Sequence, residues 1–302
     1  MPISRAQLAA ELEPGLNALF GLEYDRYDNE HTDIFDAESS DRAYEEEVML
    51  GGFGTAPVKP EGQGTDYDDA QETYTARYEH ETIALAFALT EEAVEDNLYD
   101  SLAKRYTKAL ARAMSQTKQI KAAAILNNAF TGGASAIGDG VALCSAAHPT
   151  LSGNQSNVLA TAADLNETSL EQALINIAGF QDERGLRVAC QGVKIIIPKE
   201  LQFVAERVLN STLRPGTNDN DPNAHRSMGM IPQGAVVNHF LTDTDAWFIK
   251  TDMPNGFKHF TRTALKTGME GDFDTGNMRY KARERYSFGA SDFRCVLGTP
   301  GG

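Results

Sequence analysis

Two patterns in the chain contain residue types that nucleophilic catalysis requires. The first places Cys144 four residues before His148, so a thiol could act as the nucleophile and an imidazole as its base. Pro149 favours an extended conformation at His148, and the nearby sequence offers no evident acid that would orient the imidazole. We interpret Cys144 as a buried structural cysteine beside a loop histidine, with a cysteine-dependent enzyme as an alternative.

The second pattern is Ser-x-x-Lys, which acylating serine enzymes use. It occurs at Ser101–Lys104 and at Ser115–Lys118. Both matches lie inside one long expected helix, where lysine is common on the surface, and no companion motif accompanies them. We interpret both as helix surface, so the sequence predicts no catalytic residue and a protein that is not an enzyme.

Ligand-binding motifs are incomplete. The glycines of Gly51–Gly54 follow no parallel strand and open no helix, as a phosphate-binding loop would. The segment Asp219–Asn223 begins like a calcium loop, but Ala224 replaces the required glycine and Met230 the required glutamate. The six histidines are scattered without metal-ligand spacing. We expect neither a cofactor nor a metal site.

The charge of the chain is strongly negative. Its 302 residues include 27 basic and 43 acidic side chains, a net charge of −16. Proteins that bind nucleic acid by counterion release present a cationic face, so this balance argues against that class. Many of the acids crowd residues 25–47, too polar to fold on a core of their own. We expect this segment to be an arm that becomes ordered on another surface.

Targeting signals and disulfides are not expected. No apolar run approaches the roughly 20 residues that span a bilayer, and the N-terminus lacks the pattern of a signal peptide. The three cysteines are Cys144, Cys190 and Cys295, and they lie far apart in the sequence. An odd number without paired spacing favours a reducing, intracellular environment.

A long two-stranded ribbon is the clearest pattern in the first third of the chain. Side chains alternate over Thr73–Leu89, about 17 residues, and Tyr44–Leu50 offers a partner strand. Between them, Gly51–Asp69 is rich in glycine and proline and predicts a flexible tip. A strand of that length would reach roughly 55 Å. An isolated ribbon is marginal in water, so we expect it to lie against another molecule.

A long helix follows the ribbon. Thr90 is a plausible N-cap, and apolar residues recur at helical spacing from Glu91 to Asn128 without proline or glycine. Such a helix would be roughly 55 Å long and could cross a sheet. The other elements that the sequence predicts are helices at 4–20, 165–184 and 199–210, strands at 193–197, 236–241 and 246–250, and a mobile polar loop at 213–229.

Four cations share one face of the last alternating segment, Asn277–Leu297. They are Arg279, Lys281, Arg283 and Arg285. Spaced about 6.6 Å apart, they repel one another and need a counter-charge. One interpretation is a solvated sheet face with Glu284 and other acids nearby. The other is a seam between subunits, in which the acidic arm or hairpin of a neighbour supplies the negative charge.

The order of these elements resembles the major capsid protein of tailed bacteriophages, the Hong Kong ninety-seven capsid fold. The segments GDGVALCSAAHPT, VKIIIPKEL and MRYKARERYSFGASDFRCVLG carry the resemblance locally, and it extends over essentially the whole chain. It implies an α+β fold built from an arm, an extended β-hairpin, a spine helix and an axial domain. The implied divisions are the N-terminal arm at 1–43, the hairpin (E-loop) at 44–88, the peripheral domain with the spine helix at 89–150, the axial domain at 151–255 and the return strands at 256–302.

The resemblance also implies a function. Such proteins self-assemble into the pentamers and hexamers of an icosahedral shell around double-stranded DNA, aided by scaffolding, portal and sometimes decoration proteins. The chain would be made in a host cytoplasm and reside in the virion, touching DNA without sequence-specific binding. We take Lys59, Arg77 and the four cations of the last segment as candidate intersubunit contacts. Lys59 is the only lysine of the hairpin, and without a matching acceptor we expect no covalent crosslink. A cargo shell of the encapsulin type is the alternative.

Overall fold

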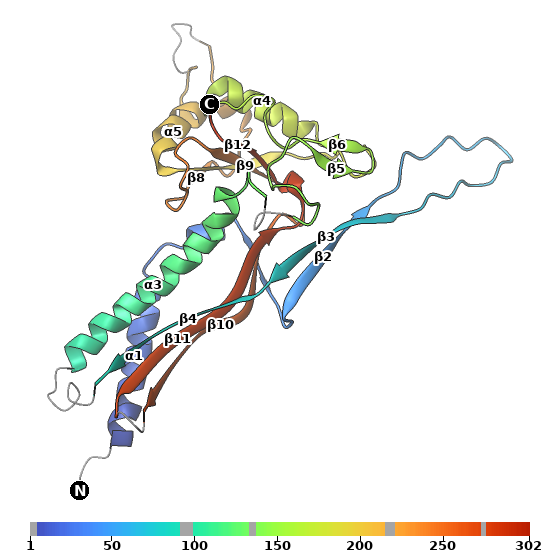
Figure 1. The fold of residues 1–302 in the computed structure, drawn as a ribbon. Coiled ribbons are helices and arrows are strands. Elements are labelled where there is room, and N and C mark those ends of the chain that lie inside the picture. The colour runs from blue at the N-terminus through green and yellow to red at the C-terminus, as the bar shows by residue number, and fades with distance from the viewer. Residues whose placement is uncertain (1–4, 91–98, 133–136, 215–220, 273–275) are drawn as a thin grey trace.

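The structure is a computed structural model that describes residues 5–90, 99–132, 137–214, 221–272 and 276–302. It has three parts: an upper α/β unit, a long lower body in which helices lie on a sheet, and a hairpin that projects from their junction (Figure 1). The helices are α1 (Arg5–Tyr24), α3 (Tyr99–Asn127), α4 (Glu167–Ala178), α5 (Gln202–Asn210) and α6 (Ala224–Met228), with short 3-10 turns η1 (Glu30–Asp33), η2 (Lys199–Leu201) and η3 (Phe293–Cys295).

The strands form two four-stranded sheets and two two-stranded ribbons. The lower sheet has the order β1-β10-β11-β4, the upper sheet β12-β9-β7-β8, and the ribbons are β2-β3 and β5-β6. The strand bounds are β1 (Asp36–Ser39), β2 (Tyr44–Gly51), β3 (Gln71–Glu79), β4 (Glu81–Leu89), β5 (His148–Thr150), β6 (Gly153–Gln155), β7 (Gly192–Ile197), β8 (Ala235–Val237), β9 (Trp247–Thr251), β10 (Phe257–Gly271), β11 (Met278–Ala290) and β12 (Val296–Thr299).

The predicted 17-residue strand is divided at His80, where the chain changes partner. β3 pairs with β2 in the projecting hairpin, whereas β4 pairs antiparallel with β11 in the lower sheet. The His80 ring lies at this crossing within hydrogen-bond distance of two hydroxyls, Ser287 Oγ at 3.0 Å and Ser40 Oγ at 2.9 Å. The extended conformation is therefore confirmed, but the ribbon has only the length of β3.

The spine helix α3 lies along one face of the lower sheet together with α1. Its buried residues Ala103, Leu110 and Met114 pack against Leu16 and Phe20 of α1 and against the sheet. The predicted helix is confirmed from Tyr99 onward and ends at Asn127. Its predicted first turns, at Glu91–Leu98, lie outside the described residues.

The N-terminal arm is ordered on its own subunit, which corrects the expectation that it needs another surface. Ile34 and Phe35 are buried in the core, and β1 pairs in parallel with β10. Lys250 Nζ donates to the backbone oxygen of Ile34 at 2.7 Å, and the backbone N–H of His31 donates to Gln119 at 3.1 Å. Two buried apolar residues, one strand pairing and these hydrogen bonds together dock the acidic run.

The upper unit differs from the sequence prediction in three places. The strand predicted at 236–241 is shorter, because β8 ends at Val237, and β7 separates it in the sheet from β9, which confirms the strand predicted at 246–250. The helix predicted at 165–184 ends at Gly179, and Gly185 instead occupies a turn at φ 84°. The loop predicted at 213–229 contains α6, whose N-cap is Asn223. The buried strand β7 and helix α5 are confirmed.

Candidate intersubunit surfaces

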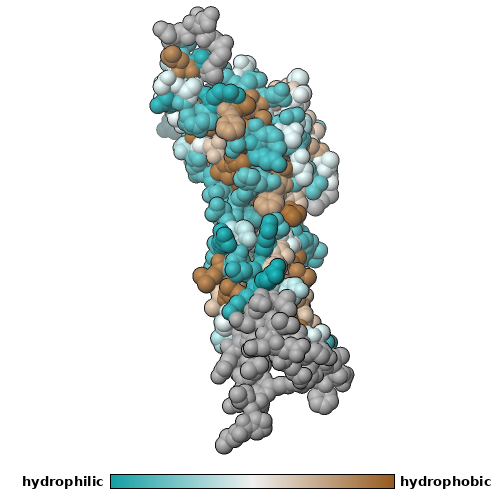
Figure 2. Space-filling view, turned by 90° about the vertical axis from the view of Figure 1, so that its left-hand side faces the viewer, coloured by the Kyte–Doolittle hydropathy of each residue, from teal (hydrophilic) through white to brown (hydrophobic). Residues whose placement is uncertain are grey.

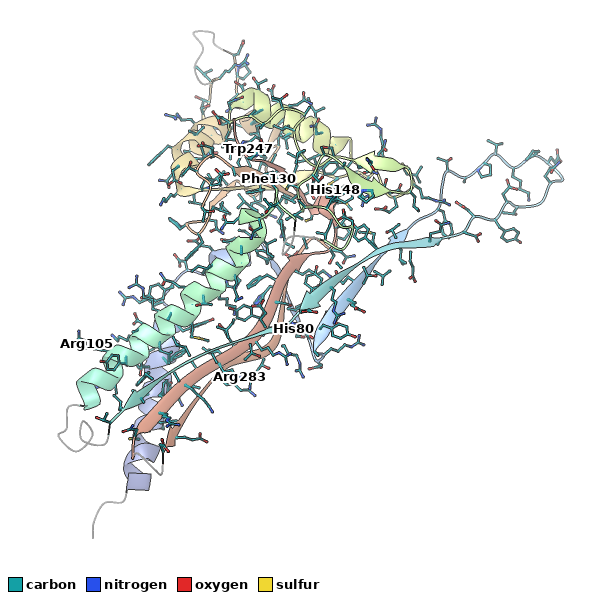
Figure 3. The ribbon with its side chains drawn as sticks, in the orientation of Figure 1. His80, Arg105, Phe130, His148, Trp247 and Arg283 are labelled. Carbon is teal, nitrogen blue, oxygen red and sulfur yellow. The ribbon has the colours of Figure 1, made fainter. Side chains whose placement is uncertain are left out.

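Cys144 and His148 do not form a nucleophile and base. The His148 ring is fully buried, with Nδ1 2.6 Å from Asp139 Oδ2 and Nε2 3.1 Å from Asn157 Oδ1. Both ring nitrogens are thus engaged by groups other than the thiol. Burial raises the pKa of the Cys144 thiol far above its ordinary value, which suppresses the reactive thiolate. Asp139 is an orienting acid that the spacing of the sequence did not indicate, yet the histidine that it orients is structural. Figure 3 shows the position of His148 in the upper unit.

The other chemical motifs also have structural roles where they are described. Ser115 is buried, and Lys118 pairs with Glu284 at 3.5 Å. The side chain of Ser101 lies outside the described part of the chain. So do Asp219 and Asn220, the first two residues of the segment that begins like a calcium loop. Within the described part, no three His, Cys, Asp or Glu side chains gather as a metal site requires. No helix described there is long and apolar enough to cross a membrane.

The hairpin is rigidly attached at its base. Tyr78 of β3 packs edge-to-face on Phe260 with 4.9 Å between ring centroids, and its hydroxyl bonds Ser291. Lys258 bridges Glu47 of the hairpin and Glu38 of the arm. Gly289 permits this contact because a Cβ there would lie 2.6 Å from the Tyr78 ring. The hairpin therefore projects in a fixed direction (Figure 1).

The tip of the hairpin, residues 52–70, has almost no support from the body. Its large apolar side chains are exposed: Phe53 by 62%, Val58 by 93% and Tyr67 by 97%. Asp68 is held by the Gly54 N–H at 2.7 Å and by Arg184 at 2.6 Å, and these bonds lower its pKa. The segment has four acids against one base, Lys59. It is an acidic surface whose large apolar side chains are not covered by any described part of this subunit.

The predicted cation row lies on the sheet face opposite the helices. Along β11, Tyr280, Ala282, Glu284 and Tyr286 are buried, while the cations of the row alternate with them and three of the four are exposed. Glu284 therefore faces the helices, where it pairs with Lys118, and cannot neutralise the row. The interpretation of a solvated face counted Glu284 among the acids near the cations. The alternation along β11 excludes this, because it turns Glu284 to the opposite face of the sheet.

The four cations differ in how far they are satisfied. Arg279 pairs with Asp272, and Arg285 Nε donates to the His80 backbone oxygen at 3.4 Å. Lys281 and Arg283 are exposed and have no carboxylate partner among the described residues. Beside them β4 presents a flat strip of exposed small side chains, Ala84, Ala86 and Ala88. Figure 3 shows Arg283 at this position on the sheet.

The subunit's own hairpin covers only the upper end of this face. Ser287, Gly289 and Ser291 continue the row of Arg283 and Arg285, and they contact His80 and Tyr78 of the hairpin base. The lower, cationic end stays uncovered. Arg77 does not join it, because it pairs with Glu79 at 3.3 Å, lies near Glu46 at 3.8 Å and stacks over Tyr44 within its own hairpin.

A rigid body with a projecting hairpin, an unsupported tip and an uncovered charged sheet face belongs to the class of shell-forming subunits. The sequence matches the family described as phage capsid protein over residues 73–298, and the chain belongs to this family. It is a structural protein of the phage virion, a major capsid protein with the Hong Kong ninety-seven fold.

Solved structures share the fold at low sequence identity. A virus-like particle from Pyrococcus furiosus is 9% identical, with 94% of this chain and 97% of that chain covered and a TM-score of 0.53. The capsid of a native GTA particle is 12% identical over 89% of each chain, with a TM-score of 0.54. The capsid of Myoviridae phage XM1 is 11% identical over 89% of each chain, with a TM-score of 0.52. No curated protein matched the sequence.

Proposed function

We propose that copies of this chain close into the pentamers and hexamers of an icosahedral shell that encloses double-stranded DNA. The observation that carries the proposal is the hairpin tip, where three large apolar side chains are more than half exposed. The hairpin cannot fold back to bury these side chains. Covering them with another molecule is therefore what lowers the free energy. The family of the chain makes a second copy the natural partner.

The acidic tip fits the cationic sheet face of a neighbouring copy. The tip carries four acids and the single cation Lys59, whereas the uncovered face presents Lys281 and Arg283 with Arg279 and Arg285 beside them. Opposite charges fix the register of such a contact more than they add affinity. In this arrangement the apolar side chains of the tip cover the alanine strip of β4, and Arg77 stiffens the hairpin behind the contact.

Further partners and the division of the chain follow from the same proposal. A scaffolding protein, a portal and a decoration protein would join the shell, which would form in the host cytoplasm. The chain would perform no catalysis. Its parts would be the arm (1–43), hairpin (44–88), peripheral domain (89–150 and 256–302) and axial domain (151–255). The upper sheet supports the last of these as a unit with its own core, and β12 at 296–299 adds a strand to that sheet from the return segment.

Negative-stain microscopy of the full chain, expressed with its natural partners, tests the proposal. We expect closed shells for the natural sequence and none for the triple variant Phe53→Ser, Val58→Ser, Tyr67→Ser. The exposed residues Leu22 and Ile120 give a matched control, since Leu22→Ser with Ile120→Ser removes apolar surface of a different face. The proposal would be contradicted if the tip variant formed as many shells as the natural chain. It would also be contradicted if the natural chain stayed unassembled.

The second candidate is a cargo shell of the encapsulin type. It is favoured by the match to a virus-like particle, of which 97% of the chain is covered. The contents of purified particles separate the two functions. Packaged DNA supports the phage head, and enclosed protein without DNA supports the cargo shell.

A further inference from the structure

Charge is divided unevenly along the chain. The first 90 residues contain 20 acids and five bases, which accounts for nearly all of the net negative charge. Residues 101–128, most of α3, contain six bases and no acid. A helical stretch of 28 residues with six bases and no acid is unexpected in a protein of net charge −16, so its cations call for a separate explanation.

The cations of α3 divide by the direction they face. Lys118 and Lys121 point toward the subunit and pair with Glu284 and Glu81. Arg105, Lys108 and Arg112 are exposed, lie at helical spacing on one face, and have no acidic partner in the described part of the chain. At 1.5 Å per residue they form a stripe about 10 Å long. We call these three residues the α3 stripe.

The α3 stripe lies on the side of the molecule away from the sheet. Figure 3 places Arg105 on the outer side of α3, and the coloured part of the surface seen from that side in Figure 2 is mostly hydrophilic. Lys108 and Arg112 also line a shallow hollow of about 310 Å³ between α3 and α1. The acid that lines this hollow, Glu23, is already bonded to Arg26 at 3.4 Å and to Tyr27.

We propose that the α3 stripe binds the phosphate backbone of the enclosed duplex DNA, an inference that rests on the proposed shell. In that shell the sheet face is covered by a neighbour's hairpin, so the opposite face, which carries α3, is the one left to meet the contents. Duplex DNA carries one charge about every 1.7 Å of its axis, so a stripe of this length faces several phosphates. The contact is independent of sequence and weak for one subunit, and many copies line a shell.

An acidic protein segment is the competing occupant. The arm of another copy is a poorer candidate, because three of its acids are already paired within their own subunit. Glu30 bonds His239 at 2.7 Å, Asp36 lies 3.3 Å from Lys250, and Glu38 lies 3.1 Å from Lys258. The hairpin tip is assigned to the sheet face. Packaged DNA is the polyanion that remains.

The test uses the dissociated full-length chain, on which both faces are accessible. Fluorescence anisotropy of a labelled 30-base-pair duplex is measured at about 10 and about 100 mM salt, where the Debye length falls from about 30 to about 10 Å. Arg105→Gln with Lys108→Gln and Arg112→Gln should weaken binding at least tenfold at low salt. The slope of log K against log salt should fall by about 2.7, since each lost phosphate contact contributes about 0.9.

A matched variant removes the same charge elsewhere. Arg187, Lys199 and Arg207 are exposed cations of the upper unit, and their change to Gln should alter binding less than twofold. Equal losses in both variants, or no DNA binding by the natural chain at low salt, would overturn the assignment. So would an unlabelled peptide of residues 25–47 that binds the stripe more tightly than DNA does.

The outcome is distinguishable from failure of the shell itself. The DNA assay needs no assembly, and the α3 variant should still form closed shells by negative stain. Absent shells with intact, stripe-dependent DNA binding would count against the proposed function alone. Intact shells with stripe-independent DNA binding would count against this inference alone.

Discussion

At the residue scale, Asn157 holds together two distant parts of the chain. Its amide nitrogen donates to the backbone oxygens of Leu143 at 2.7 Å, Phe293 at 3.0 Å and Val296 at 3.1 Å. Its oxygen accepts from the Ser145 N–H at 2.8 Å and lies 3.1 Å from His148. Because the side chain is fully buried, water cannot replace these bonds.

We predict that Asn157→Ala lowers the free energy of unfolding by at least about 3 kcal/mol, because several buried polar groups lose their partner at about 1–3 kcal/mol each. Urea unfolding followed by circular dichroism measures the change. Asn154→Ala, at an exposed position of β6, is the control and should change stability by less than about 0.5 kcal/mol. A loss below 1 kcal/mol for Asn157→Ala would show that the network is dispensable.

Two buried histidines make docking of the arm sensitive to acid. His31 of η1 meets His259 of β10 edge-to-face, 5.3 Å between ring centroids, with Phe288 and Tyr286 packed around them. Burial, and then the positive charge of Lys118, lowers the pKa of His31 to about 4. Burial, Lys118 and His31 lower the pKa of His259 to about 3.

Because both folded values lie below the ordinary 6.5, the undocked chain binds protons more tightly. We predict that the contribution of the two histidines to stability is constant above about pH 7 and falls from about pH 6.5 toward pH 4, by up to about 1.4 kcal/mol per pH unit for each histidine. Urea unfolding at pH 7.5, 6 and 5 measures the slope. His31→Phe should reduce it, whereas exposed His239→Gln should not. If the free energy of unfolding depends on pH as steeply in His31→Phe as in the natural chain, His31 does not cause the sensitivity to acid.

At the element scale, the projection of the hairpin depends on a glycine of the sheet below it. The Tyr78 ring lies over Gly289 and cannot move aside, because it is bonded to Ser291 and packed on Phe260. We predict that Gly289→Ala destabilises the protein by about 1–3 kcal/mol, the usual cost of overpacking. It should also accelerate proteolytic cleavage in the hairpin. Gly64→Ala, where a Cβ meets nothing within 4 Å, is the control and should cleave at the natural rate.

Local elements could be predicted from the sequence, whereas their pairing could not. Alternation indicated the strands around His80 and the single face of the cation row, and helical spacing indicated α3. The change of partner at His80 and the insertion of β7 between β8 and β9 depend on contacts between residues far apart in the chain. Local periodicity carries no signal for such contacts.

The candidate site was predictable to the same extent. Period-two alternation placed Arg279, Lys281, Arg283 and Arg285 together, and the structure has them on one face. The pairing of Arg279 with Asp272 and the position of Asp139 beside His148 arise in irregular loops, where spacing does not fix distance. The role of the cation row and of Lys59 in intersubunit contact stays a prediction.

At the scale of the whole molecule, each copy carries both halves of the proposed contact, an acidic tip and a basic face. The charges of the tip and of the face can therefore be reversed in one sequence, separately or together. Lys281→Glu with Arg283→Glu leaves the tip of every neighbour facing like charge, so we predict that shells fail to form. Both residues are exposed, so the variant subunit should stay folded. High salt should weaken assembly of the natural chain, because exposed charges are screened beyond about 10 Å at 0.1 M.

Restoring the sign of the attraction tests the contact itself. Asp66→Lys with Asp69→Lys makes the tip basic, and alone it should also prevent assembly by meeting the natural cation row. Combined with Lys281→Glu and Arg283→Glu, it should recover closed shells, since every tip again faces opposite charge in every neighbour. Negative-stain counts of shells for the two double variants and the quadruple variant measure this coupling. If the quadruple variant assembles no better than either parent, the tip does not bind this face, and the cations serve another surface of the shell.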